Sequence, residues 1–541
     1  MKSTKHQWIL FIIITLVQVA IIAFWGSKKE NLYWDEYYTL EGAHYFSNSN
    51  HEEHYIDEDP DFNVGEWMPV SFIKDTLIVG ENETLLKEPI VNVIKKLTGY
   101  HNYSAFLNIA ESILSLGAFS IWPAIILNIL FFILSQIVLY ALCKKLSKNE
   151  GFPLAVCVMY GFSSICVSMA IFIRCYMLAT LLVCLFTFLH LQYFETDGDE
   201  LKARCKRIAL MVAAFVTLYV VHNIAQYSVV YGGLFVITFA ILLAIRKGIK
   251  RFMYYFLPMF IGGFGYLYTQ TEYLKILFDH KDSYNDSNAA LGSTLDGIVD
   301  FKLEFLPTRV TDMAHILGRY LFGSFFVLLI FVAIAIIMVF VHKFNTSNNG
   351  EKEFFSPFMV VSSTTAIAYI VIFTVFGLYE QVRYISFVFP ELAIFVMVIA
   401  YNTFRNNKYK NTLVVLLIVV TALGVNLKGK VDMLYTGDRT SIEKIREFDA
   451  DSYLLNTGNH RTFMMYETAF VAEDDDEFFV YDELEPGAQD NLIANLRDKM
   501  IFVGYYGVST QDLQNILIEN GYQIDWIADT YNYVFYTVVR N

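Results

Sequence analysis

The chain has 541 residues, of which 55% are apolar by a broad count and only 17% are charged, with a formal net charge of −14. These proportions exclude an ordinary soluble globular protein. The acidic balance argues against nucleic acid as a partner. The composition therefore predicts an all-α polytopic membrane protein.

Eleven apolar runs of about 20 residues recur along the chain, and each is long enough to cross about 30 Å of hydrocarbon as a helix. The predicted spans cover residues 8–25, 119–142, 152–172, 177–194, 208–222, 225–245, 252–270, 321–341, 357–377, 385–402 and 412–427.

The predicted orientation follows from the connections between these spans, because Lys and Arg in short loops favour the cytoplasmic side. Five alternate connections are basic, and they include Lys144, Lys206, Arg246, Lys343 and Lys408. We therefore expect a multi-pass protein of the plasma membrane with a cytoplasmic N-terminus. Two lysines disagree with this pattern, since Lys28 and Lys29 fall just outside the first span.

Two long loops are predicted on the external side of a transmembrane domain over 1–427, at residues 26–118 and 271–320. The stretches EPIVNVIKKL and YSAFLNIAESILSL of the first loop have helical spacing of apolar residues, which predicts external helices along the membrane surface.

The tail, residues 428–541, carries 21 acidic residues against 9 basic ones, which is typical of a solvated domain. Ser441 is predicted to cap a helix, IEKIREF, and Ser509 a second helix that Gly521 stops. LLNTG, MIFVGYY and YNYVFYTVVRN are predicted as strands. The tail is therefore expected to be a small extracytoplasmic α/β or α+β domain.

Charged side chains near hydrocarbon are costly and mark functional sites by default. Asp35 and Glu36 lie among aromatic residues after the first span, in NLYWDEYYTLEGAHYF. Neighbouring residues point to different sides of a regular element, so one carboxylate is expected to accept a proton and the other to support it. The alternative is an interfacial aromatic belt with incidental acids.

Other polar residues stand at the predicted external ends of spans, and we expect them to converge with Asp35 in one cleft. Arg174, in FIRCYM, and Arg383, in YEQVRYISFVFP, are suited to bind phosphate oxygens, or alternatively snorkel to ordinary phospholipid. His222 is either a substrate contact or a satisfied polar residue in the bundle. Tyr176 and Tyr384 accompany the two arginines.

This order of motifs resembles the GT-C superfamily of polytopic glycosyltransferases over about residues 8–405. It is similar to the bacterial protein mannosyltransferase and RgtA/B/C/D-like family in particular. The matching segments are Asp35-Glu36 in YWDEYY, Arg174-Cys175-Tyr176-Met177-Leu178, Val221-His222, and Arg383-Tyr384 before Pro390.

The resemblance implies transfer of a hexosyl or pentosyl group from a polyprenyl-phosphate donor at the outer face of the membrane. The acceptor would be an envelope polymer, a glycolipid or a protein. Asp35 would be the catalytic base, assisted by Glu36, and a single displacement would invert the anomeric centre. Arg174, Tyr176, His222, Arg383 and Tyr384 would bind the substrate or its lipid phosphate.

Two segments depart from the pattern of this family. Where relatives carry a diprolyl stretch the chain has His101-Asn102-Tyr103-Ser104, and where relatives often have a His before Arg-Gly it has His280 before KDSYND. His101 and His280 are retained as candidate substrate contacts, and these changes bear on acceptor or donor specificity.

Three questions stay open at this point. A divalent metal is an option because Asp35, Glu36 and His222 offer ligand atoms, although no dedicated ligand spacing occurs. A lipid or polysaccharide transporter or flippase is the alternative function, but it predicts repeated halves and charges at mid-span. A scaffold protein anchored by the membrane part is the third class, and one span would suffice for it.

Overall fold

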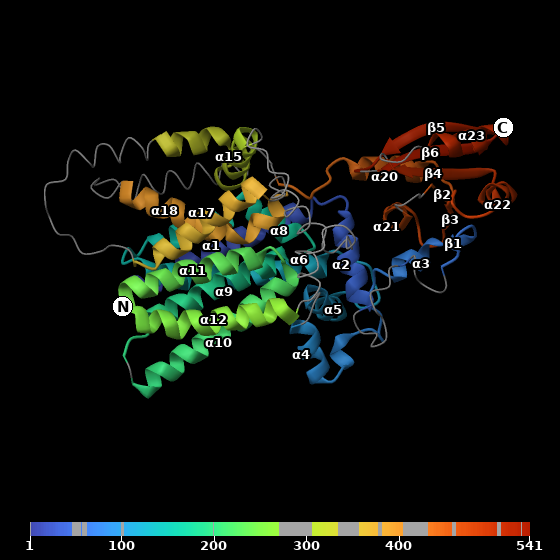
Figure 1. Cartoon of the computed structure of the whole chain (residues 1–541). Helices are drawn as coiled ribbons and strands as arrows, with labels where there is room; N and C mark the ends of the chain where they lie inside the picture. The colour runs from blue at the N-terminus through green and yellow to red at the C-terminus, as the bar shows by residue number, and fades with distance from the viewer. Residues whose placement is uncertain are drawn as a thin grey trace. The chain divides into compact units, whose positions relative to one another are not determined.

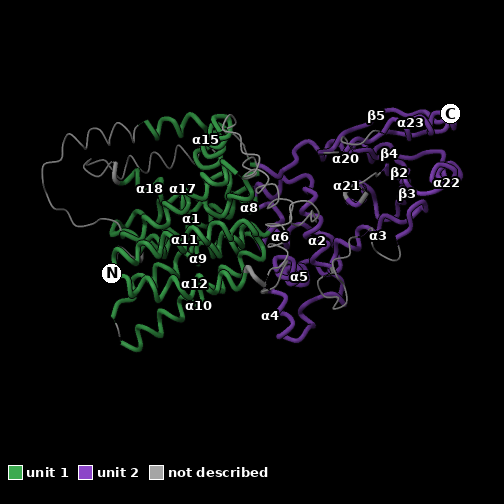
Figure 2. The backbone as a smooth tube through the Cα atoms, in the orientation of Figure 1, with its two compact units in different colours: residues 1–23, 128–170, 175–431 green, residues 24–127, 171–174, 432–541 purple. Residues whose placement is uncertain are grey.

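The computed structural model describes residues 2–45, 56, 62–98, 102–198, 200–269, 306–333, 356–376, 381–403, 431–456, 461–505, 510–531 and 533–541. The predicted span 412–427 and the candidates His101 and His280 lie outside the described residues. The chain divides into two compact units (Figure 2). Unit 1 comprises 1–23, 128–170 and 175–431, and unit 2 comprises 24–127, 171–174 and 432–541.

The helices of unit 1 are apolar on most of their surface, as expected for helices surrounded by lipid and by one another. In chain order they are α1 (Lys2–Gly26), α6 (Trp122–Leu146), α7 (Phe152–Gly161), α8 (Ser164–Ile171), α9 (Tyr176–Glu195), α10 (Leu201–Ile224), α11 (Ser228–Lys247), α12 (Ile249–Thr269), α15 (Leu306–Phe322), α17 (Met359–Phe376), η5 (Val382–Val388) and α18 (Phe389–Thr403). Figure 1 shows these helices as a bundle.

Among the described residues, seven helices are long and apolar enough to cross a membrane, or nine if each bent pair of helices forms one span. The multi-pass helical fold is thus confirmed. The predicted number of eleven spans is not tested, because part of the chain lies outside the described residues.

One predicted span is a bent pair of helices in the structure, and a second bent pair joins the end of the predicted loop 271–320 to the start of the predicted span 321–341. The run 152–172 breaks between Gly161 and Ser164 with an angle of 57°. A Cβ atom on Gly161 would lie 2.3 Å from the Gln18 amide nitrogen and 2.6 Å from the Gln136 amide nitrogen, so a larger residue would displace these two side chains. The helix Leu306–Phe322 is followed at 93° by a helix over Phe325–Ala333. A bend needs packing against neighbours, which hydropathy alone does not reveal.

The first loop folds into helices within unit 2: α2 (Trp34–Tyr45), α3 (Val70–Asp75), η2 (Leu85–Lys87), α4 (Ile90–Thr98) and α5 (Asn102–Leu114). Both helices predicted from apolar spacing, α4 and α5, are present. One face of α5 is buried, and its Asn108 side chain donates to the carbonyl oxygens of Ala43 and Glu83 and accepts from the Leu85 N–H, each at 2.8 Å. This residue ties α5 to α2 and to the start of η2.

Unit 2 also contains a mixed sheet, formed by β1 (Trp67–Pro69), β2 (Ser452–Asn456), β3 (Glu477–Tyr481), β4 (Lys499–Tyr505), β5 (Tyr522–Asp529) and β6 (Tyr533–Arg540) in the order β1-β3-β2-β4-β6-β5. The central β2 pairs in parallel with β3 and β4, and the outer pairs are antiparallel. The tail adds α20 (Asp438–Glu447), α21 (Arg461–Val471), α22 (Ala488–Asn495) and α23 (Gln511–Glu519). The expected mixture of helices and strands, of α/β or α+β type, is confirmed.

Strand β1 comes from the first loop and not from the tail. Trp67 stands opposite Phe479 in the antiparallel pair, donates from Nε1 to the Asn495 carbonyl at 2.9 Å, and lies under the Arg497 guanidinium at 4.0 Å. The expected division into 1–427 and 428–541 separates two segments that share this sheet in the structure.

One helix of the tail starts earlier than predicted. Helix α20 begins at Asp438, after Gly437 with φ of 107°, so Ser441 lies inside the helix and does not cap it. The cap comes from outside the tail, because a Glu30 carboxylate oxygen accepts the Gly437 N–H at 2.7 Å. A distant acceptor of this kind leaves no local sequence signal. The predicted stop of α23 is confirmed, since Gly521 follows its end with φ of 86°.

Candidate active site

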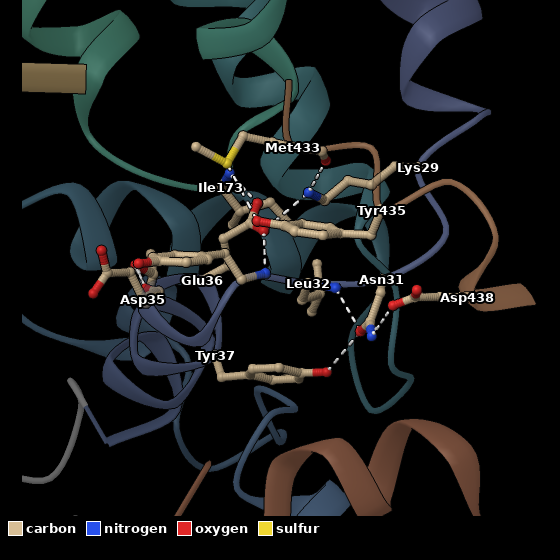
Figure 3. Close-up of polar contacts among 12 residues, drawn as sticks. Lys29, Asn31, Leu32, Asp35, Glu36, Tyr37, Ile173, Met433, Tyr435 and Asp438 are labelled. Carbon is tan, nitrogen blue, oxygen red and sulfur yellow. Dashed lines mark hydrogen bonds and ion pairs between the residues drawn. The ribbon is translucent and has the colours of Figure 1, made fainter. Parts of the chain in front are cut away.

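The Asp35-Glu36 pair occupies the first turn of α2. Acidic side chains are favoured there because the helix dipole is positive at its N-terminus. The two carboxylates have different surroundings, since Asp35 is partly exposed and Glu36 is completely buried. In Figure 3 the Asp35 carboxylate points away from the Glu36 side chain.

Glu36 binds three groups with its two oxygens. Oε1 accepts the Ile173 N–H at 2.7 Å, and Oε2 accepts the Tyr33 N–H at 2.7 Å and faces the Lys29 ammonium at 2.9 Å. The contact with Tyr33 is one half of a capping box, in which a third-position Glu satisfies the N-cap amide. Glu36 thereby fixes the start of α2 and holds the segment 171–174 beside it.

Lys29 is the cation that makes the burial of Glu36 tolerable. Its ammonium also donates to the Met433 carbonyl at 2.7 Å and lies 5.1 Å from the centre of the Tyr435 ring (Figure 3). Burial raises the pKa of Glu36 and lowers the pKa of Lys29, and their ion pair counters both shifts. The disagreement of Lys29 with the basic-loop pattern therefore has a local cause, since this lysine neutralises a buried acid.

Asn31 connects the same segment to the tail. Its amide nitrogen donates to Asp438 at 2.8 Å and to Glu467 at 3.0 Å, while its oxygen accepts the Leu32 N–H at 2.7 Å and the Tyr37 hydroxyl at 3.2 Å. Burial raises the pKa of Glu467 to about 7. Asn31 thus fastens the segment that leads into α2 to both α20 and α21.

Arg174 lies against the Asp35 backbone. Its guanidinium donates to the Asp35 carbonyl at 3.1 Å and to the Thr39 hydroxyl at 2.9 Å, and that hydroxyl in turn donates to the same carbonyl at 2.9 Å. Asp35 and Arg174 are therefore neighbours within unit 2, although 139 residues separate them in the sequence. The side-chain contact of Glu36 with Ile173 is what brings Arg174 to this place.

The other candidates belong to unit 1. Tyr176 starts α9, and the preceding Cys175 thiol contacts the Ile224 carbonyl at the end of α10 at 3.0 Å. His222 lies in the last turn of α10, buried, with its ring 5.3 Å from that of Tyr266. The ends of α9 and α10 that carry Tyr176 and His222 therefore lie together.

Arg383 and Tyr384 lie in η5, which packs against α9. The Arg383 guanidinium donates to the Tyr384 hydroxyl at 3.2 Å and covers its ring at 5.0 Å. The Tyr384 ring also lies 4.6 Å from Tyr227, just before α11. The candidate residues of unit 1 thus lie at neighbouring helix ends. That they form one cleft with Asp35 and Arg174 of unit 2 stays a prediction.

The described residues hold no group of three or more His, Cys, Asp or Glu side chains arranged to bind a metal. All three groups bound by Glu36 are hydrogen-bond donors of the protein, so its oxygens serve internal contacts. Whether the protein binds a divalent metal ion stays open.

Lys29 and Asn31 are the residues that sequence reasoning missed. The only signal for Lys29 was its misfit to the charge pattern of the loops, and Asn31 had none, because its partners lie more than 400 residues away.

No protein-family model matches the sequence, and no curated relative matches it significantly. Solved structures do match. The apo crystal structure of ArnT from Cupriavidus metallidurans aligns at 12% identity over 99% of this chain and 98% of that one, with a TM-score of 0.51. The same protein bound to undecaprenyl phosphate aligns at 13% identity over 98% and 97%, with a TM-score of 0.50.

A third match is the apo oligosaccharyltransferase of Archaeoglobus fulgidus, at 8% identity over 97% of this chain and 74% of that one, with a TM-score of 0.50. At such low identity these likenesses concern the fold alone. The chain is a multi-pass membrane protein whose fold is similar to the folds of ArnT and of the Archaeoglobus fulgidus oligosaccharyltransferase.

Proposed function

We propose that this protein is a membrane glycosyltransferase that moves a sugar from a polyprenyl-phosphate donor to a cell-envelope acceptor on the outer face of the membrane. The fold supports this class of reaction, because ArnT shares it and has been crystallised with undecaprenyl phosphate. The single observation that carries the proposal is the contrast at the start of α2, where Asp35 is partly exposed and Glu36 is consumed by internal bonds.

Asp35 is the general base in this proposal. A carboxylate at the positive end of a helix is well placed to take the proton of an acceptor hydroxyl as that oxygen attacks the anomeric carbon. The polyprenyl phosphate leaves on the opposite face, so one displacement inverts the anomeric configuration. Glu36 acts as a positioning residue, since it holds both the start of α2 and the segment 171–174, which includes Arg174.

Arg174 is the cation of unit 2 that serves the leaving phosphate, since guanidinium groups recognise phosphate oxygens and stay charged. Tyr176, His222, Arg383 and Tyr384 are the proposed substrate contacts of unit 1, where their helix ends lie together. Removing one preorganised donor of this kind costs about 3 kcal/mol in the barrier, or roughly a hundredfold in rate. Arg174→Lys would keep the charge and lose the planar donor set.

Asp35→Asn tests the proposal, with Asp75→Asn as the control because Asp75 is an exposed acid of the same unit. Purified protein is incubated with lipid extracts from cells that lack the protein, and glycosyl transfer is followed by mass spectrometry. We expect Asp35→Asn to lose transfer by a factor of about a thousand or more while the control retains it. Near-normal turnover by Asp35→Asn would refute the base assignment.

The substrates can be identified by comparing cells that have the protein with cells that lack it. Loss of the enzyme should remove one glycosyl mass from an envelope polymer, glycolipid or protein and leave its polyprenyl donor to accumulate. The anomeric configurations of donor and product, read by nuclear magnetic resonance, test inversion. Activity after chelation of divalent ions decides the metal question.

A further inference from the structure

Glu391 is an acid inside the apolar bundle of unit 1 that the proposed reaction does not use. It lies in the first turn of α18, near the middle of the candidate span Val382–Tyr401, and is 1% exposed. Its Oε1 atom accepts the Thr187 hydroxyl of α9 at 2.5 Å, and the hydroxyls of Tyr231 in α11 and Ser362 in α17 lie near the same carboxyl group. Ionisable groups at this depth are costly and mark functional positions.

The surroundings of Glu391 indicate that its carboxyl group is neutral. Within the part of the chain that the structure describes, the groups that face it are hydroxyls, and no lysine or arginine is among them. An isolated charge in apolar surroundings is so costly that the neutral form is favoured. Glu391 Oε2 and the Ser362 hydroxyl oxygen are buried and make no hydrogen bond with the described residues. A proton on Oε2 supplies the donor that these two oxygens lack.

Helix α18 directly follows η5, the 3₁₀ helix that carries Arg383 and Tyr384. A 3₁₀ helix of seven residues is uncommon, because its internal hydrogen bonds are poor. Neighbouring helices support it instead. The Tyr369 hydroxyl of α17 donates to the Tyr384 carbonyl at 3.0 Å, and the rings of Tyr369 and Tyr231 lie 5.4 and 5.9 Å from that of Phe387.

We propose that Tyr369 and Glu391 are positioning residues for the substrate contacts of η5. Tyr369 fixes the backbone next to Arg383, and Glu391 fixes the junction of η5 with α18 against α9 and α11. Held near both ends, η5 keeps the Arg383 guanidinium over the Tyr384 ring, ready for a lipid phosphate. The identity of that ligand rests on the proposed function. A displacement of about 1 Å at such a contact costs up to roughly a hundredfold in rate.

Four variants of the full-length protein test this proposal. Tyr369→Phe removes the hydroxyl that holds η5 and keeps the ring. Glu391→Gln keeps a neutral hydrogen-bonding group at the junction, whereas Glu391→Leu removes it. Tyr254→Phe in α12 is the matched control for the loss of a hydroxyl, because the Tyr254 side chain is 65% exposed on the outside of the bundle.

The first measurement is hydrogen-deuterium exchange of the backbone amides of 382–388 in detergent, together with the melting temperature. Tyr369→Phe and Glu391→Leu should exchange severalfold faster in η5 while melting close to the parent, and Glu391→Gln and Tyr254→Phe should match the parent in both. Unchanged exchange in Tyr369→Phe and Glu391→Leu would overturn the proposal. Faster exchange throughout the bundle with a lower melting temperature would also overturn it, because the two residues would then stabilise the whole of unit 1.

The second measurement is the affinity for undecaprenyl phosphate, obtained by titration without turnover. Tyr369→Phe and Glu391→Leu should bind it about tenfold more weakly than the parent, as expected for one lost hydrogen bond, and Glu391→Gln should bind it normally. Parent-like binding by variants with a loosened η5 would refute the positioning role. Absence of binding by the parent would refute the proposed donor, whereas faster exchange in the variants would still establish how η5 is held.

Discussion

Different forces stabilise the interior of each of the two units. This difference explains why the elements of one unit were easier to predict from the sequence than those of the other. Unit 1 is built from apolar helices, mostly consecutive in the chain, whose length and hydropathy reveal them one by one. Unit 2 is assembled from three distant segments. Its active-site segment is fastened by buried polar contacts that span 404 to 436 residues of sequence, from Lys29 to Met433 and from Asn31 to Asp438 and Glu467.

The helix that carries the candidate base depends on the tail for its position. Lys29, Asn31 and Glu30 all bond to residues of the tail, and Glu36 depends on Lys29. A helix in lipid keeps its backbone bonds within itself, whereas the irregular segment 27–33 takes its partners from elsewhere. Damage to the polar contacts of unit 2 should therefore exceed damage to single helices of unit 1.

The largest loss of stability is expected for Lys29→Met. The substitution leaves the Glu36 carboxylate buried without its cation, and removing one partner of a buried ion pair costs about 3–5 kcal/mol. Thermal unfolding of the detergent-solubilised protein, followed by protease resistance of the tail, measures the effect. Lys28→Met is the matched control, because Lys28 is the exposed neighbour.

The double variant Lys29→Met, Glu36→Gln should recover much of the loss, since no buried charge remains unpaired. Equal melting of Lys29→Met and Lys28→Met would contradict the assigned role of the pair.

The next effect concerns pH. Burial raises the pKa of Glu467 to about 7 from its ordinary value near 4.5, so the folded state binds the proton more tightly than the unfolded state. This contribution to stability is fully present below about pH 4.5 and is lost as pH rises through about 7. Its full size is about 3 kcal/mol.

Glu467→Gln, which resembles the protonated acid, should flatten the pH dependence of unfolding between about pH 5 and 8. Glu483→Gln, at an exposed position of the tail, should leave it unchanged. The same slope in Glu467→Gln and in the parent would assign the pH dependence to other groups.

A smaller loss of stability is expected in unit 1, at the bend between the helices Leu306–Phe322 and Phe325–Ala333. A Cβ on Gly318 would lie 2.7 Å from the Phe325 Cα, so Gly318→Ala forces backbone movement at the 93° bend. The expected cost is about 1–3 kcal/mol. Gly263→Ala is the matched control in α12, where a Cβ meets nothing within 4 Å.

The control substitution should stabilise by about 0.5–1 kcal/mol, because alanine is the better helix former. Should Gly318→Ala unfold at or above the temperature of the Gly263→Ala variant, the bend does not depend on this glycine.

The smallest effect is expected for the ion pair of Lys74 and Asp474, 2.5 Å apart, at the surface of unit 2. The Asp474 side chain is 81% exposed, so solvent screens the interaction. Asp474→Asn should change stability by less than about 1 kcal/mol. A loss as large as that of Lys29→Met would show that charge pairing as such, and not burial, governs unit 2.

The sequence by itself determined the elements whose cause is local. Hydropathy located most helices of unit 1, apolar spacing located α4 and α5, and short runs of apolar and aromatic residues located β2, β4 and β6, because each pattern is written in neighbouring residues. It also singled out Asp35 and Arg174, since charge next to hydrocarbon is rare. The structure makes these two residues neighbours, although their catalytic roles are proposals.

Only the tertiary structure decided which groups meet. The pairing of β1 with β3, the start of α20 at the Glu30 carboxylate, and the burial of Glu36 with Lys29 all depend on partners from distant segments. A buried polar group needs a partner but does not specify its identity through any local pattern. Apolar burial is nondirectional and readable along the chain, whereas hydrogen bonds and ion pairs are directional and acquire their partners only when the chain has folded.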